Sequence, residues 1–197
     1  LGIEQDFRRY GEDEEWRLSL NKAYNDKAEK IVGRRLLSEE RGNPRACFPP
    51  VKAIGEVFGG RNEWHDQSWW LMPAAETPDQ LKAVLDRMDR LDIRKAMLPE
   101  NWDDEKARLA REYPEVKPPR FRGFRGPCTL ACSLYGAESM VLLVLDAPDL
   151  AARFRDAILR VAVAMADVLD KENGDEPGAV KGGFGFADDN CCLFTPA

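Results

Sequence analysis

The sequence is poor in the residues on which most metal sites, disulfide frameworks and histidine-based catalytic systems depend. Its 197 residues include one histidine, His65, and five cysteines whose spacing matches neither a metal motif nor a disulfide framework. A Ser-His-Asp or Cys-His nucleophile system would therefore depend on His65 alone. The odd number of cysteines favours reduced thiols, and we expect a cytoplasmic protein.

Long apolar runs and basic stripes are also lacking. The longest apolar run, residues 140–145, is far shorter than the roughly 20 residues of a membrane span. The net charge is -6, and no basic stripe with interleaved aromatic residues occurs. The first six residues do not resemble a secretory signal. We expect neither a membrane nor a nucleic acid as a partner.

Three common catalytic and nucleotide-binding motifs are missing as well: Walker A, G-x-S-x-G and H-E-x-x-H. Gly183 and Gly185 begin a G-x-G-x-x-G pattern, but its third glycine position holds Asp188. A carboxylate there would repel a pyrophosphate, so the pattern does not indicate dinucleotide binding.

What the sequence does contain is enough apolar material for a core, since 44% of its residues are hydrophobic and nine are Phe. Periodicity and capping signals predict helices and strands, whereas residues 45–73 are irregular and predict no defined element. The predicted helices cover residues 16–37, 77–91, 103–112, 127–136, 137–145 and 148–171, and the predicted strands cover residues 121–126 and 180–187. In the last helix, Phe154 and Val161 should face the sheet.

Two strands separated by helices imply a parallel crossover. A parallel sheet needs both faces covered and its edges protected, which two to four strands cannot achieve alone. We therefore expect an α/β fold, the N-terminal portion of a TIM-type (β/α)8 barrel with extra N-terminal helices, left incomplete in this chain. Residues 1–119 would form a helical region with the first barrel elements, and residues 120–197 the barrel strands and crossover helices.

The second predicted strand ends in two carboxylates, Asp188 and Asp189. In α/β folds this end of a strand is where ligands bind. Because neighbouring residues of a strand point to opposite faces, one carboxylate would enter the pocket and the other would support a loop. We expect Asp188 in the pocket, as a candidate acid, base or cation ligand, with Asp189 in support. A surface turn with two capping carboxylates is an equally good interpretation.

Two further stretches are candidate binding elements. The helix start at Gly126, Pro127 and Thr129 could present backbone N–H groups to an anionic substrate, although an ordinary helix start explains it equally well. The tryptophan-rich residues 64–70, which include Asp66, could line a flat hydrophobic ligand, or could simply fill one end of a barrel.

Several segments together resemble the uroporphyrinogen decarboxylase superfamily: residues 126–136, the helix start at residues 146–150, and residues 186–190 with Thr195 and Pro196. That family has a distorted TIM barrel of about 350 residues and includes tetrapyrrole decarboxylases and corrinoid-linked methyltransferases. The resemblance extends over residues 120–196 and is faint before residue 77.

The resemblance also assigns residues. Ser133 stands where the decarboxylase has a substrate-contacting tyrosine, with Tyr135 two residues away, and Asp189 stands at its substrate-contacting serine. The arginine-rich motif that grips the decarboxylase substrate has no match. The pair Asp188 and Asp189 is more similar to the methyltransferase branch, whose zinc ligands would lie beyond Ala197; no cofactor is identifiable within the chain.

We therefore expect a methyltransferase-type enzyme that moves a methyl group between a corrinoid or methylated substrate and a thiol. A decarboxylase of tetrapyrrole carboxylates is the first alternative, and a non-catalytic ligand-binding relic is the second. The candidate partners are a tetrapyrrole or corrinoid ligand, a corrinoid protein and a second copy of the chain. The candidate catalytic residues are Asp188 and Asp189, and the candidate substrate-binding residues are Asp66, Thr129, Ser133 and Tyr135.

Overall fold

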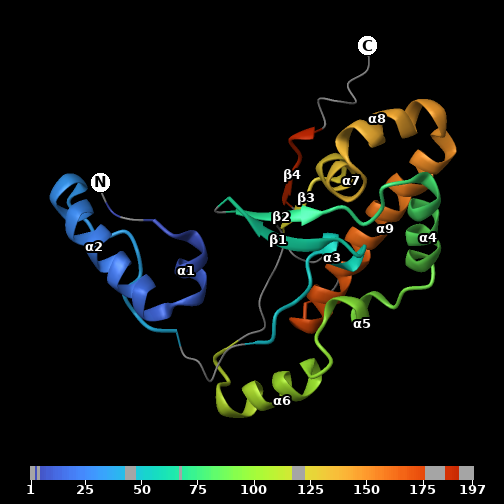
Figure 1. Cartoon of the computed structure of the whole chain (residues 1–197). Coiled ribbons are helices and arrows are strands. Elements are labelled where there is room, and N and C mark those ends of the chain that lie inside the picture. Colours follow the sequence, from blue (N-terminus) through green and yellow to red (C-terminus); the bar gives the residue numbers. More distant parts are fainter. Residues whose placement is uncertain are drawn as a thin grey trace. The chain divides into compact units, whose positions relative to one another are not determined.

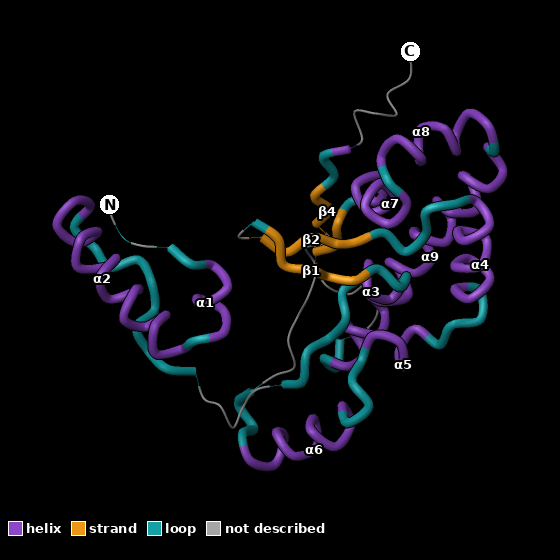
Figure 2. The backbone as a smooth tube through the Cα atoms, in the orientation of Figure 1, coloured by secondary structure: helices purple, strands orange, loops and turns teal. Residues whose placement is uncertain are grey.

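The computed structural model describes residues 3, 5–42, 48–66, 68–116, 123–175 and 185–190. The chain divides into two compact units, Leu1–Cys47 with Trp64–Trp70, and Phe48–Glu63 with Leu71–Ala197. Helices predominate, and the strands form two separate two-stranded sheets, drawn in orange in Figure 2. This mixture of helix and strand is compatible with the expected α/β class.

The elements follow one another along the chain as labelled in Figure 1. They are α1 (Phe7–Glu12), α2 (Glu14–Val32), α3 (Ile54–Val57), β1 (Arg61–His65), β2 (Ser68–Met72), α4 (Pro78–Met88), α5 (Ile93–Met97), α6 (Trp102–Glu112), β3 (Gly123–Arg125), α7 (Pro127–Tyr135), α8 (Ala137–Asp146), α9 (Pro148–Glu172) and β4 (Gly185–Ala187).

Helices α1 and α2 of the first unit begin at aspartate caps. The Asp6 side chain accepts a hydrogen bond from the backbone of Arg9, and Asp13 accepts one from Trp16. The predicted helix over residues 16–37 was too long, because α2 ends at Val32. Gly33 adopts a left-handed conformation with φ of 74°, which terminates the helix.

The segment that follows α2 folds back along the helix through polar contacts. Buried Asn25 accepts hydrogen bonds from the backbone N–H groups of Leu36 and Leu37, and donates to the Leu37 carbonyl. Buried Asn21 donates to the carbonyl of Ser38 and accepts from the hydroxyl of Tyr10. A side-chain amide with both donors and acceptors can thus replace backbone pairing for a loop.

The second unit is organised around α9, the orange helix in Figure 1. Its apolar face packs against α3, α4, α5, α7 and α8. The side chains of Phe154, Ile158, Val161 and Met165 are at most 2% exposed, as their spacing predicts. The prediction that this face meets the sheet was incomplete, because its main packing partners are helices.

Five of the predicted helices are confirmed, with ends that shift by a few residues. They correspond to α4, α6, α7, α8 and α9. Thr77 caps α4 with Pro78 at the first helical position, and Gly136 ends α7, as the capping signals indicate. The short helices α3 and α5 were not predicted, since four or five residues contain too little of a helical period to recognise.

The predicted parallel crossover is confirmed by β3 and β4. The two strands pair in parallel with Gly123 opposite Gly185 and Arg125 opposite Ala187. Helices α7, α8 and α9 connect them. Residues 121–122 and 180–184, which were predicted as parts of these strands, lie outside the described residues.

The hairpin of β1 and β2 lies in the stretch for which the sequence predicted no defined element. Its turn contains Asp66, whose positive φ of 46° is a conformation that aspartate tolerates better than most residues. The rings of Trp64 and Trp69 meet edge to face, with centroids 5.3 Å apart. Trp64, Trp69 and Trp70 do not alternate regularly with polar residues, as apolar residues do in a half-buried strand. The sequence pattern therefore did not predict the hairpin.

Within the part of the chain that the structure describes, no single helix combines the length and apolar composition of a membrane span. Helices α7 and α8 reach such a length only as a pair, which is bent by 100°.

Candidate functional site

The site begins where the parallel strands β3 and β4 end. Because parallel strands share a direction, their carboxyl ends lie at the same edge of the sheet. The backbone N–H of Gly126, just after β3, donates to the carbonyl of Ala187, the last residue of β4. The segment that starts α7 and the segment that carries Asp188 and Asp189 are therefore neighbours, although about 60 residues separate them in sequence.

Asp188 binds the N-terminus of α7. Its Oδ1 accepts hydrogen bonds from the backbone N–H of Thr129 at 2.8 Å and from the Thr129 hydroxyl at 2.9 Å. Its Oδ2 accepts one from the backbone N–H of Cys128 at 3.0 Å. The N-cap residue of α7 is Gly126, which has no side chain to do this, so a distant carboxylate takes the place of a local cap.

The same contacts set the ionisation of Asp188. Burial raises the pKa of this carboxyl, but the hydrogen bonds from Thr129 and Cys128 outweigh burial and hold the pKa below its usual value. The positive end of the helix dipole acts in the same direction. Asp188 is thus an ionised carboxylate whose two oxygens are engaged by the protein.

Gly126 permits this close approach. A Cβ atom at this position would lie 2.2 Å from Cβ and 2.4 Å from Cγ of Asp188. No side chain fits at such distances, so glycine is required for Asp188 to reach the helix.

Thr129 joins both segments through one hydroxyl group. Its Oγ1 donates to Asp188 and accepts from the backbone N–H groups of Asp189 at 2.8 Å and Asn190 at 3.2 Å. A hydroxyl has one donor and two acceptor positions, and all three are used here. Thr129 was predicted to offer its backbone to an anionic substrate; in the structure its N–H group binds Asp188.

A cation also belongs to this end of the sheet. Arg125, the last residue of β3, is exposed and donates from Nη1 to Oγ of Ser133 at 2.8 Å. Ser133 in turn donates to the carbonyl of Thr129 at 2.8 Å. The predicted substrate-binding serine therefore holds Arg125 against α7.

The structure brings together Asp188, Asp189, Thr129 and Ser133 at this edge. Asp189 is exposed, whereas Tyr135 at the end of α7 is 4% exposed, and burial raises the pKa of its phenol. Asp66 lies in the hairpin turn, which belongs to the first compact unit, and the other candidates belong to the second. Whether any of these residues acts on a substrate stays a prediction.

Two hollows adjoin the start of α7. A small cavity of about 90 Å³ is lined by Arg125, Phe124 and Leu130 together with residues around α3 and the hairpin. A larger groove of about 330 Å³ is lined by Pro127 and Cys128 together with α8 and α9. Neither Asp188 nor Asp189 lines either hollow. The sequence predicted that Asp188 would lie in a pocket, and it lies in neither of these two.

The described residues contain no group of three or more His, Cys, Asp and Glu side chains that could hold a metal ion. The zinc that the family resemblance implies would therefore need ligands from elsewhere. Cys128 is half-buried and Cys132 is buried, and burial together with the nearby charges of Cys128 and Asp188 raises the pKa of Cys132. That thiol is poorly suited to be a thiolate ligand.

Sequence reasoning missed two features of the site. Arg125 was assigned to a strand without a role, although its place at the carboxyl end of β3 could have marked it. The capping of α7 by Asp188 had no signal, because a cap is sought within a few residues of the helix start. The fold alone joins these two segments.

Comparison of the chain with models of known protein families, with curated proteins and with solved structures finds no match.

Proposed function

We propose that the chain is part of an enzyme of the uroporphyrinogen decarboxylase superfamily, of the methyltransferase type, built on a TIM-type (β/α)8 barrel. The observation that carries the proposal is the parallel pairing of β3 with β4 across three helices. A parallel crossover through helices is the connection that α/β barrels use between neighbouring strands, and their chemistry takes place at the carboxyl ends of the strands. Arg125, Asp188 and Asp189 stand at that end.

The contacts of the two carboxylates suggest different roles. Asp188 is engaged by three hydrogen bonds from α7 and is therefore a positioning residue, which fixes the helix start and the loop after β4. Asp189 is exposed, and Thr129 holds its backbone N–H. We assign to Asp189 the contact with substrate, as the family resemblance does, where a carboxylate can accept hydrogen bonds or a proton.

Arg125 favours a second candidate, a decarboxylase of tetrapyrrole carboxylates. An exposed guanidinium at the carboxyl end of a strand is suited to bind a substrate carboxylate through two parallel hydrogen bonds. The bond to Ser133 uses Nη1 and fixes the side chain from one side. Both proposed activities use the same edge of the sheet. For either of them we propose a cytoplasmic enzyme whose partner is a corrinoid protein or a second copy of the chain.

The test is an assay of methyl transfer by the full-length protein. The protein is incubated with methylcobalamin, a small thiol and zinc; loss of the methylcobalamin absorbance and the thioether detected by mass spectrometry measure turnover. We expect Asp189→Asn to lower turnover by about two orders of magnitude, the scale for a positioned acid–base or electrostatic group. Asp149→Asn, a change at an exposed carboxylate of α9, is the matched control.

Other outcomes favour the alternatives. Release of CO₂ from a tetrapyrrole carboxylate, with no methyl transfer and with loss of activity in Arg125→Gln, would establish the decarboxylase instead. Binding of a tetrapyrrole or corrinoid without turnover of either kind would leave the non-catalytic interpretation, and equal activity of Asp189→Asn and Asp149→Asn would reject the role of Asp189.

A further inference from the structure

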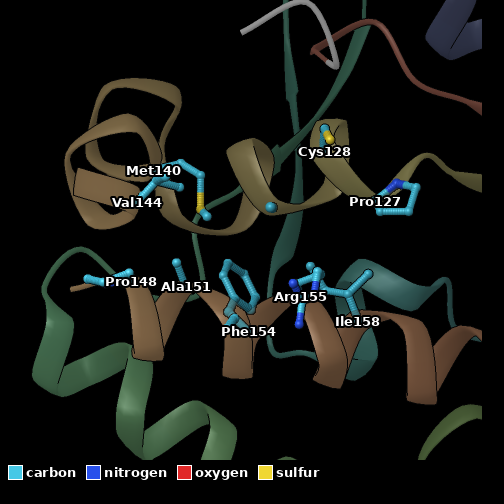
Figure 3. Close-up of a pocket in the computed structure, with 11 residues that line it drawn as sticks. Pro127, Cys128, Met140, Val144, Pro148, Ala151, Phe154, Arg155 and Ile158 are labelled. Carbon is cyan, nitrogen blue, oxygen red and sulfur yellow. The ribbon is translucent and has the colours of Figure 1, made fainter. Parts of the chain in front are cut away.

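The larger groove, which neither carboxylate lines, lies between α9 on one side and α7 and α8 on the other. Figure 3 shows Pro148, Ala151, Phe154, Arg155 and Ile158 along α9, with Met140 and Val144 of α8 across the gap. Its volume is about 330 Å³. Pockets for small molecules begin at roughly 300 Å³, so the groove has room for a small ligand.

The walls of the groove are almost entirely apolar. Phe154, Ile158, Met140 and Ala131 are each at most 7% exposed and form its buried surface, while Val144 is 40% exposed and lies nearer to solvent. Methionine is a flexible side chain that adapts to the shape of an apolar ligand. An aliphatic chain is the chemical group that such walls accept best, since they offer it burial without unpaired polar groups.

Among the described residues that line the groove, Arg155 is the one that carries a charge. Its Nε and Nη2 contact Oδ1 of Asp156, and both side chains are about two-thirds exposed, at 63% and 65%. An exposed pair of this kind contributes little stability, and a guanidinium has five N–H donors. A second carboxylate can therefore bind to Arg155 without the cost of breaking a buried ion pair.

We propose that this groove binds a medium-length aliphatic carboxylate, with the chain between α9 and α8 and the carboxylate on Arg155. The ligand has one anionic group, to match the one cation among the described lining residues, and a short apolar body, because the volume is near the lower limit for ligand sites. The proposal does not depend on the chemistry at the strand ends.

The probe for the test is decanoate, used below the concentration at which it forms micelles, with 1-decanol as its uncharged counterpart. Isothermal titration of the protein should give one site for decanoate. Arg155→Gln should weaken decanoate binding by tenfold or more and leave 1-decanol binding within a factor of two. Arg155→Lys, which restores the charge, should recover most of the decanoate affinity.

A second variant tests the place of binding. Ala152, a half-buried residue that lines the groove, is replaced by Phe to fill it, and Ala164, a half-buried residue more than three turns further along α9, is replaced by Phe as the matched control. Ala152→Phe should abolish binding of both probes and Ala164→Phe should not. Decanoate should also slow the alkylation of the half-buried thiol of Cys128, followed by mass spectrometry of its peptide.

Three results would overturn the proposal. One is the absence of decanoate binding to the folded protein, and another is equal decanoate affinity of Arg155→Gln and the original protein. The third is an Ala152→Phe variant that keeps binding but changes its oligomeric state, because the groove would then be a contact between copies of the chain.

Discussion

Each of the two compact units of the chain is stabilised internally by a different kind of interaction. In the second unit, α9 and its neighbouring helices bury a continuous set of apolar side chains. In the first unit, the residues buried among those described are Asn21, Asn25 and Ala28, so that two of the three are polar. Apolar burial is non-directional and scales with area, whereas each hydrogen bond depends on one geometry.

The comparison shows that the length of a helix and the signals at its ends do not reveal which interactions stabilise it. Helices α2 and α9 have 19 and 25 residues and clear start signals, Asp13 as the N-cap of α2 and Pro148 at the first position of α9. Yet α9 is fixed by its packing, while α2 is tied to the following segment by side-chain amides and by ion pairs of Arg35 with Asp26 and Glu29. Exposed ion pairs add little, so the amides should decide the stability of the first unit.

The largest expected effect is in the core of the second unit. Phe154 is 1% exposed and its ring lies 6.4 Å from that of Phe58. Phe154→Ala should lower the free energy of unfolding by about 3–5 kcal/mol, because it removes apolar contacts and leaves a cavity. Urea unfolding followed by circular dichroism measures the change. Val163→Ala on the same helix, at a 62% exposed site, should change it by less than about 0.5 kcal/mol.

A buried carboxylate extends the comparison, since it is a polar contact inside the apolar unit. Glu172 accepts hydrogen bonds from Trp102 Nε1 at 2.8 Å, Arg94 Nε at 2.8 Å and Lys106 Nζ at 3.0 Å. Burial raises its pKa, but these three donors outweigh burial and lower the pKa from 4.5 to about 2. The contacts join α5 and α6 to the end of α9.

Because the pKa of Glu172 is lower in the folded protein, its stabilising contribution is fully present above about pH 4.5. It is lost as the pH falls from there to about 2. Its size is about 2–3 kcal/mol, reduced because Arg94 and Lys106 are partly exposed. Free energies of unfolding measured at several pH values should show this contribution, and Glu172→Gln should reduce the slope by that share, since Asp188 also has a lowered pKa. Glu138→Gln, at an exposed site of α8, should keep the slope.

The third prediction tests whether amides hold the first unit. Asn25→Ala removes the partner of the Leu36 and Leu37 N–H groups and should destabilise the packing of residues 34–39 on α2 by about 1–3 kcal/mol. Hydrogen exchange of residues 14–39 measures this locally. Exchange in α9 should be unaffected, and Lys30→Ala at an exposed site of α2 is the control. Unchanged protection of residues 34–39 would mean that something other than Asn25 holds the segment.

The smallest expected effect is at the cap of α7. Asp188→Ala should cost about 1–2 kcal/mol, because the N–H groups of Cys128 and Thr129 lose their acceptor. Asp188→Asn keeps one acceptor oxygen and should cost less. Hydrogen exchange of the Cys128 and Thr129 amides is the measurement, and it should be faster in Asp188→Ala than in Asp189→Ala. Equal exchange in both variants would contradict the capping role of Asp188.

Much of the second unit could be predicted from the sequence. The helices α4, α7, α8 and α9 are marked by apolar periodicity, by Pro78, Pro127 and Pro148 at their starts and by Gly136 between two of them. These signals are local, because a helix pairs its backbone within four residues. The parallel pairing of β3 and β4 could also be predicted from the sequence, because the helices between the two strands leave room for a crossover connection.

The end of α2 and the hairpin of β1 and β2 could be predicted less well. Val32 and Leu36 lie four residues apart on either side of Gly33 and so continue the helical spacing, yet they are exposed at 56% and 45%. The pattern of apolar residues therefore suggested a longer helix than the one that forms. A left-handed glycine overrides such a pattern, because the backbone cannot continue the helix through it.

The sequence by itself determined, to within a few residues, where the longer helices of the second unit lie and which face of α9 is buried. Only the tertiary structure decided what Asp188 does: 59 residues separate it from Thr129, and the two meet because β3 and β4 pair in parallel. The same holds for Glu172 and its donors on α5 and α6, and for the groove beside Arg155. Local order follows from contacts within one turn or strand, whereas a site forms from groups that the folded backbone alone brings into contact.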